Sequence, residues 1–140
     1  NSKYIDYMIN AREDHLKTYY DLDVYARIKN EKRGWVVAKN EIVYRRPALL
    51  MEEVNIQSQV LQYSPRHLQV EIGMYNQDHT ELKALLWTVF VPFDMVTMRA
   101  DQHTDSLMQL LQQAHLPVQE PTIDERVKAV QEQLALVGQE

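Results

Sequence analysis

The chain has 140 residues, of which 45% are hydrophobic and 25% charged, and its formal net charge is −5. A chain of this length and composition is expected to form a single folded domain with a sizeable core, not a disordered segment. The acidic balance argues against a nucleic-acid partner, because binding the phosphate backbone requires a basic surface.

The sequence contains no cysteine, which excludes disulfides, thiolate zinc sites and cysteine nucleophiles. This is consistent with a reducing compartment, and we expect a cytoplasmic location. No apolar run approaches the roughly 20 residues of a membrane span, so no membrane association is predicted. Because position 1 is Asn and not Met, we expect further residues upstream of it.

A wide apolar face marks residues 1–20 as a helix. No Gly or Pro interrupts this stretch. One row of its side chains recurs with helical spacing at Tyr4, Met8, Ala11, His15 and Tyr19, and Ile5, Ile9 and Leu16 lie one position behind it. Such a helix needs burial on most sides, which predicts a sheet that curls around it.

Four segments with alternating or β-branched patterns follow, and they predict strands at residues 35–44, 52–63, 68–74 and 82–91. In the first of them, Val36, Ala38, Ile42 and Tyr44 are expected to share one face. The second and third form a predicted hairpin around the turn at residues 64–66. The fourth is apolar on both faces, so we expect it to be central or covered, and Pro92 is expected to end it.

Residues 101–140 are predicted to form a helical C-terminal extension of the same domain, which spans residues 1–140. Asp101 or Thr104 would cap the first helix, and the pattern Thr122-x-x-Glu125 is typical of a capping box that opens the second. The second helix carries an apolar stripe, formed by Val127, Val130, Leu134 and Val137. This stripe favours packing on its own domain, and a coiled-coil partner is the alternative.

The sequence contains none of the motifs that indicate a metal site or a bound cofactor. The five histidines show no ligand spacing, and there is no nucleophile elbow, P-loop or dinucleotide fingerprint, so no metal and no cofactor are predicted. Two other features carry chemical meaning. The backbone N–H groups of Asn1, Ser2 and Lys3 at the predicted helix start could hold an oxyanion, or this end could simply be capped.

The second feature is a pair of basic dipeptides, Arg45-Arg46 and Arg66-His67, each of which falls at the end of a predicted strand. Guanidinium groups bind phosphate well, so these residues are candidate phosphate contacts. The alternative is that they are ordinary charges at strand ends.

Several short motifs together resemble a known family. Asn1-Ser2-x-Tyr4-x-x-Tyr7-x-x-x-Ala11-Arg12 resembles the start of the central helix in the hot-dog, 4-hydroxybenzoyl-CoA thioesterase-like family of acyl-CoA thioester hydrolases. The segment Ile42-Val43-Tyr44-Arg45-Arg46-Pro47-Ala48 is similar to that family's Tyr-x-x-Pro-Ala strand end, and Glu52-Glu53-Val54 follows in the expected place. The resemblance extends from residue 1 to about residue 93.

The resemblance implies an α+β hot-dog fold, in which an antiparallel sheet wraps a long helix, and a homodimer or homotetramer with active sites between subunits. It implies hydrolysis of an acyl-CoA or acyl-carrier-protein thioester. The backbone N–H of Asn1 would polarise the thioester carbonyl. Ser2 and Tyr4 would contact substrate, and Arg45, Arg46, Arg66 and His67 would contact the phosphates of CoA.

The sequence departs from the family pattern because the expected catalytic acid and the first strand are not among its residues. We expect both upstream of residue 1. Acids on the helix, Asp6, Glu13 and Asp14, are interpreted as solvated charges. The alternatives are a non-catalytic hot-dog module that binds acyl-CoA or serves in assembly and, with less support, another ligand-binding fold with a curved sheet and a helix.

Overall fold

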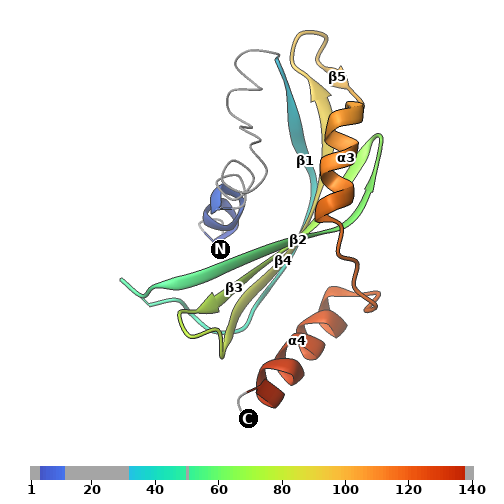
Figure 1. Cartoon of the computed structure of the whole chain (residues 1–140). Coiled ribbons are helices and arrows are strands. Elements are labelled where there is room, and N and C mark those ends of the chain that lie inside the picture. Colours follow the sequence, from blue (N-terminus) through green and yellow to red (C-terminus); the bar gives the residue numbers. More distant parts are fainter. Residues whose placement is uncertain (1–3, 12–31, 50, 138–140) are drawn as a thin grey trace.

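The computed structural model describes residues 4–11, 32–49 and 51–137 (Figure 1). The predicted N-terminal helix is described over residues 4–11 and is helical there. Its remainder, including Asn1, Ser2, Glu13, Asp14 and His15, lies outside the described residues. Asp6 is exposed, which agrees with its interpretation as a solvated charge.

A twisted antiparallel sheet forms the body of the molecule (Figure 1). Its strands are β1 (Arg33–Tyr44), β2 (Val54–Ser64), β3 (His67–Asn76), β4 (Leu82–Asp94) and the short β5 (Arg99–Ala100). The order across the sheet is β1-β4-β3-β2, and β5 pairs with β4. The predicted β2–β3 hairpin is confirmed, and β4 is central, as its two apolar faces indicated.

One face of the sheet packs against the N-terminal helix. Met8 is fully buried there among strand residues such as Ile72, Leu86 and Phe90. Helix α3 (Asp105–Ala114) contributes Leu111 to the same core. Part of the predicted helix therefore lies in the apolar concave side of the sheet, where burying a large aliphatic side chain stabilises the fold by about 2 kcal/mol.

The opposite face is covered by helix α4 (Ile123–Val137). Its side chains Ile123, Val127 and Val130 are buried against residues of β2, β3 and β4, which include Leu61, Tyr75, Leu82, Leu85 and Trp87. The apolar stripe of the second C-terminal helix thus packs on its own domain. The cap predicted at Thr104 is confirmed, since Thr104 Oγ1 accepts from Leu107 N, and at α4 Thr122 Oγ1 accepts from Glu125 N, which is one of the two bonds of the predicted capping box.

Helices α3 and α4 are joined by a segment that runs along the free side of β2. The N–H of Leu116 donates to the Val60 carbonyl at 2.8 Å, and the Gln59 side chain donates to the Leu116 carbonyl at 2.8 Å. His115 forms an isolated parallel bridge with Val60. The second half of the β2 edge is therefore already hydrogen-bonded by this chain.

Two strand predictions were wrong in detail. Pro92 does not end β4, which continues to Asp94. β3 pairs with β4 only as far as the pair Leu68–Phe90, so β3 offers no acceptor opposite Pro92, and the missing N–H of the proline breaks no hydrogen bond. The Pro92 carbonyl accepts from Asp101 N. A proline placed just beyond the end of the neighbouring strand does not interrupt the ladder.

The predicted single apolar face of β1 is also wrong. A register shift between Val37 and Lys39 changes which face the side chains occupy, so that Trp35 and Ile42 pack on the same core although they are seven residues apart. Val36 and Tyr44, which were predicted to share a face with Ile42, are exposed, whereas Ile42 packs on the core. A bulge cannot be recognised from a period-2 pattern alone.

Candidate active site

The candidate site is a cavity of about 310 Å³ at the end of β1, next to the N-terminal helix. Tyr4 from the helix, Tyr44 from the last position of β1, and the bend Arg45-Arg46-Pro47 line it. Three of the predicted substrate contacts, Tyr4, Arg45 and Arg46, are thus brought together by the fold. Asn1 and Ser2 lie outside the described residues.

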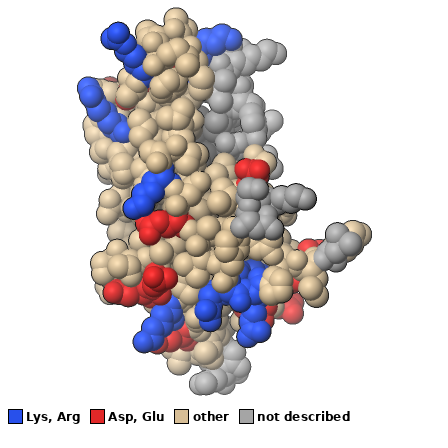
Figure 2. Space-filling view, turned by 180° about the vertical axis from the view of Figure 1, so that it is seen from behind, with Lys and Arg blue, Asp and Glu red and all other residues tan. Residues whose placement is uncertain are grey.

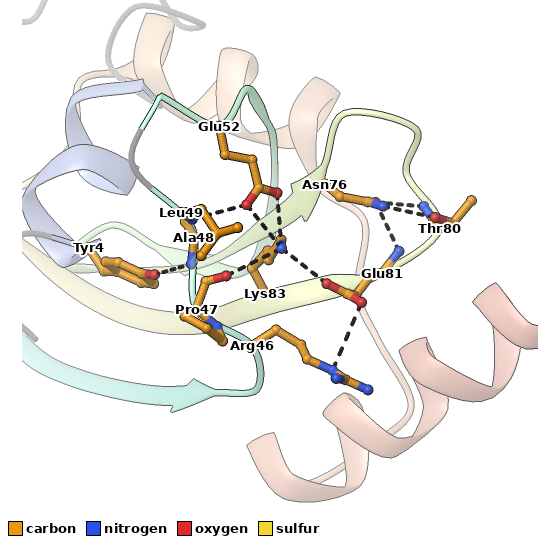
Figure 3. Close-up of polar contacts among 10 residues, drawn as sticks. All are labelled: Tyr4, Arg46, Pro47, Ala48, Leu49, Glu52, Asn76, Thr80, Glu81 and Lys83. Atoms are coloured by element: carbon orange, nitrogen blue, oxygen red, sulfur yellow. Dashed lines mark hydrogen bonds and ion pairs between the residues drawn. The ribbon is translucent and has the colours of Figure 1, made fainter.

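Aromatic and backbone contacts fix one wall of this cavity. The rings of Tyr4 and Tyr44 meet edge to face, with centroids 5.5 Å apart. The Tyr4 hydroxyl accepts a hydrogen bond from the Ala48 N–H at 2.6 Å (Figure 3). The helix is thereby tied to the bend that follows β1, and the cavity combines an aromatic wall with two guanidinium groups.

The buried side chain of Lys83 stabilises the bend formed by Arg45, Arg46 and Pro47. The Lys83 Nζ lies 2.9 Å from Glu52 Oε2 and 3.1 Å from Glu81 Oε1, and it donates to the Pro47 carbonyl at 3.3 Å (Figure 3). Its own backbone carbonyl accepts from the N–H groups of Arg45 and Arg46. Lys83 therefore contacts the bend through both its side chain and its main chain.

Protonation equilibria at this cluster favour the charged forms. The hydrogen bond from the Leu49 N–H, followed by that from Lys83, lowers the pKa of Glu52. The hydrogen bond to Glu52 raises the pKa of Lys83 despite its burial. Both shifts favour the charged forms of Lys83 and Glu52, so this cation is compensated within the cluster, while Arg45 and Arg46 line the cavity.

The other two predicted contacts lie elsewhere. The two basic pairs can be located by the β4 residues that lie opposite them. Tyr44, which precedes Arg45, pairs with Ala84, whereas Leu68, which follows His67, pairs with Phe90. Positions 84 and 90 of β4 are about 20 Å apart along a strand. The predicted cluster of Arg45 and Arg46 with Arg66 and His67 is therefore not formed within one chain.

Arg66 belongs to a separate cavity of about 490 Å³, which is lined by Arg33, Ala100, Asp101, Gln102 and His103 as well. When the Gln102 amide is oriented with its oxygen toward the Arg66 guanidinium, this oxygen accepts from Arg66 Nε and Nη2 at 3.2 and 3.0 Å. Arg33 Nε lies 2.6 Å from Asp101 Oδ2. The polar groups of this second cavity thus bind one another across the turn after β2 and the segment after β5.

Sequence reasoning missed Lys83, Glu81 and Gln131 as residues that shape the candidate site. A signal for Lys83 was present, because it is a charged residue within the otherwise apolar run LKALLWTVF of β4. Nothing in the sequence pointed to Gln131 of α4, whose side-chain oxygen accepts from Arg45 Nε at 2.9 Å when the amide is oriented toward the guanidinium. This contact depends on how α4 docks.

Within the described residues, no group of three or more His, Asp or Glu side chains is arranged to hold a metal ion. In the same part of the chain, no helix is both long and apolar enough to cross a bilayer. Basic and acidic side chains lie next to one another on the face shown in Figure 2, where they do not gather into a patch of one sign.

Comparison with known proteins identifies the family. The family model of the thioesterase-like superfamily matches residues 1–134. The chain belongs to this superfamily, and its α+β architecture of an antiparallel sheet with helices is the hot-dog fold that the sequence motifs predicted. Membership supports thioester hydrolysis as the activity at the level of the family.

Solved structures share this fold. The probable thioesterase YbaW of Escherichia coli is 25% identical, with a TM-score of 0.66 over 83% of this chain and 85% of that one. A hypothetical protein of Thermus thermophilus, TT1821, is 23% identical, with a TM-score of 0.72 over 83% of both chains. A Staphylococcus aureus protein, SAV2348, solved in complex with CoA, is 11% identical, with a TM-score of 0.71 over 86% and 77%. A search of curated proteins gave no match.

Proposed function

We propose that the protein hydrolyses acyl-CoA or acyl-carrier-protein thioesters to a free carboxylic acid and a thiol. The observation that carries this proposal is the cavity in which Tyr4 of the N-terminal helix faces the bend of Arg45 and Arg46, in a chain of the thioesterase-like superfamily. The aromatic wall suits an apolar acyl or pantetheine part, and the guanidinium groups suit phosphate oxygens.

In the proposed reaction, water attacks the thioester carbonyl carbon, the C–S bond breaks, and the thiolate leaves and takes a proton. The backbone N–H of Asn1 would stabilise the oxyanion, and one such donor contributes about 3 kcal/mol to the transition state. A carboxylate upstream of residue 1 would accept the proton from water. Ser2 and Tyr4 would position the acyl group, and we propose a homodimer or homotetramer as the working form.

Arg66 and His67 would also contact substrate, but not the substrate molecule that Arg45 of the same chain binds. The length of sheet that separates Arg45 from Arg66 means that Arg66 and His67 would contact a substrate bound mainly by a second copy of the chain, in line with active sites between subunits. Their role is therefore separable from that of Arg45 and Arg46 by mutation.

The second candidate function is a non-catalytic module that binds acyl-CoA. It is favoured by one observation, namely that two acids of the described residues near the cavity, Glu52 and Glu81, are both ion-paired with Lys83. Neither of these acids is available as a base while it is paired.

The test is release of free thiol from acyl-CoAs of increasing chain length, with the full-length protein. Turnover above background supports the hydrolase, and CoA binding without turnover at any chain length supports the binding module. Arg45→Ala is expected to raise KM with little change in kcat, because Arg45 would bind a part of the substrate that does not react. Arg99→Ala is the matched control, since Arg99 is an exposed arginine of β5 that does not line the cavity.

A further inference from the structure

A contact between the C-terminal helix and the candidate site suggests how one of its arginines is oriented. When the Gln131 amide is oriented with its oxygen toward the Arg45 guanidinium, this oxygen accepts from Arg45 Nε at 2.9 Å and from Arg45 Nη2 at 3.2 Å. Gln131 lies on α4, and Arg45 lines the 310 Å³ cavity. A helix that packs on the outer face of the sheet therefore reaches the cavity on the other side of β1.

Three cations near the cavity, all in the described part of the chain, differ in their partners. Lys83 is compensated by Glu52 and Glu81, and Arg46 Nε lies 3.9 Å from Glu81 Oε2. The partner of the Arg45 guanidinium is instead an uncharged amide. An amide fixes the plane of a guanidinium without cancelling its charge, and three of the five guanidinium N–H bonds remain for a ligand.

The position of α4 itself is fixed by a buried ion pair one turn earlier. Arg126 Nε and Nη2 donate to Glu71 Oε1 and Oε2 at 2.8 and 3.1 Å, and Trp87 Nε1 donates to the same carboxylate at 3.0 Å. The side chain of Glu71 is only 5% exposed. Because this pair anchors α4 to β3, the oxygen of Gln131 is held at a defined place above β1.

We propose that Gln131 is a positioning residue for Arg45, and that α4 thereby sets the affinity of the cavity for the phosphate groups of a CoA thioester. This inference rests on the proposed function and deepens it. A free arginine side chain loses rotamer freedom when it binds a ligand, whereas an arginine already held by Gln131 loses less. Removal of the amide therefore weakens binding of the anionic part of the substrate and leaves the chemical step unchanged.

The experiment compares Gln131→Ala with Gln133→Ala, an exposed glutamine on the same helix, in the full chain. We expect Gln131→Ala to raise KM for acyl-CoA by about fivefold at an unchanged kcat, the size of effect that loss of one typical hydrogen bond produces. Its kcat/KM for the acyl-N-acetylcysteamine thioester, which carries no phosphate, should equal that of the parent protein. Gln131→Glu should raise KM further, because a carboxylate neutralises Arg45 as well as holding it.

Direct binding of CoA, measured by calorimetry, separates this inference from the proposed function. If the parent protein binds CoA without turnover, the hydrolase proposal fails, while a weaker binding of CoA by Gln131→Ala still supports the positioning role. If Gln131→Ala binds CoA as the parent does, or loses activity equally on both substrates, the positioning role is overturned. A parent protein that neither binds nor hydrolyses CoA thioesters overturns the positioning role, and the proposed function is overturned as well if an acyl-carrier-protein thioester is not hydrolysed either.

Discussion

Lys83 and Glu52 form an ion pair with 2.9 Å between Nζ and Oε2, although only 8% of the Lys83 side chain is exposed. The pair joins the start of β4 to the segment before β2, and it passes beneath the bend that lines the candidate site. Its consequences can be measured both in stability and in substrate binding.

Replacement of Lys83 by Met should lower the free energy of unfolding by more than the loss of an exposed pair does, because it removes the buried cation that Glu52 and Glu81 share. It should also raise KM for acyl-CoA, since the bend loses its support. Urea unfolding measures the first effect. Lys39→Met is the matched control: the Lys39–Glu41 pair is exposed, and its loss should change stability by less than about 0.5 kcal/mol. Equal effects of the two changes would contradict the assignment.

The stability of the protein should fall with acid partly through Glu52. Its pKa is lowered in the folded state by the Leu49 N–H and Lys83, so the unfolded chain takes up the proton first as pH falls. The contribution is fully present well above about pH 4.3, the ordinary value for Glu, and is lost as pH falls through the lower folded value. Glu52→Gln should therefore show a shallower loss of stability below that pH in urea titrations, and an identical slope would refute this.

Gly73 should not accept even a methyl group without loss of stability. A Cβ at this position would lie 2.7 Å from Cε2 of the Tyr75 ring, which packs in the core beneath α4. We expect Gly73→Ala to destabilise the protein by about 1–3 kcal/mol through displacement of that ring. The double mutant Gly73→Ala, Tyr75→Leu should be less destabilised than the sum of the single mutants, as thermal or urea unfolding can show. Strict additivity would mean that the ring is not the obstacle.

The anchor of α4 offers a fourth measurement. Arg126→Met leaves Glu71 charged and buried without its bidentate partner, so it should lower the free energy of unfolding by about 3–5 kcal/mol. Glu71→Gln should cost less, because a neutral amide oxygen can still accept from Trp87 and Arg126. If both variants unfold at the same urea concentration as the parent, α4 is not held by this pair.

Arg66→Ala distinguishes a ligand contact from a structural one. If the Arg66 side chain binds the nucleotide part of a substrate, its removal raises KM more than it lowers kcat. This is the expected outcome under the proposed function. Steady-state kinetics with acyl-CoA measure both constants. Gln102→Ala removes the amide that binds Arg66 while keeping the guanidinium, so it serves as the matched variant. An unchanged KM for Arg66→Ala would make Arg66 a purely structural partner of Gln102.

The sequence was sufficient for the elements whose patterns are local. The β2–β3 hairpin, the two-sided apolar β4 and the caps at Thr104 and Thr122 all follow from alternation, turn residues and side-chain oxygens. Tyr4, Arg45 and Arg46 were selected from the motifs of the resemblance, and they line one cavity in the structure.

Features that depend on register or on docking could not be predicted in this way. The bulge after Val37 reverses the faces of β1, and the distance between Arg45 and Arg66 depends on which strands are neighbours in the sheet. The contact between Gln131 and Arg45 depends on a helix packing across β1, which no periodicity in either segment encodes.

The run of chain that connects α3 to α4 also restricts how copies of this protein could join. The Leu116 N–H and the His115 ring are hydrogen-bonded to the carbonyls of Val60 and Leu61, so a neighbour's strand could add to this edge mainly over its first half, before Val60. A continuous intermolecular sheet across β2 would thus be short, and the same shielding protects the domain from unlimited edge-to-edge polymerisation.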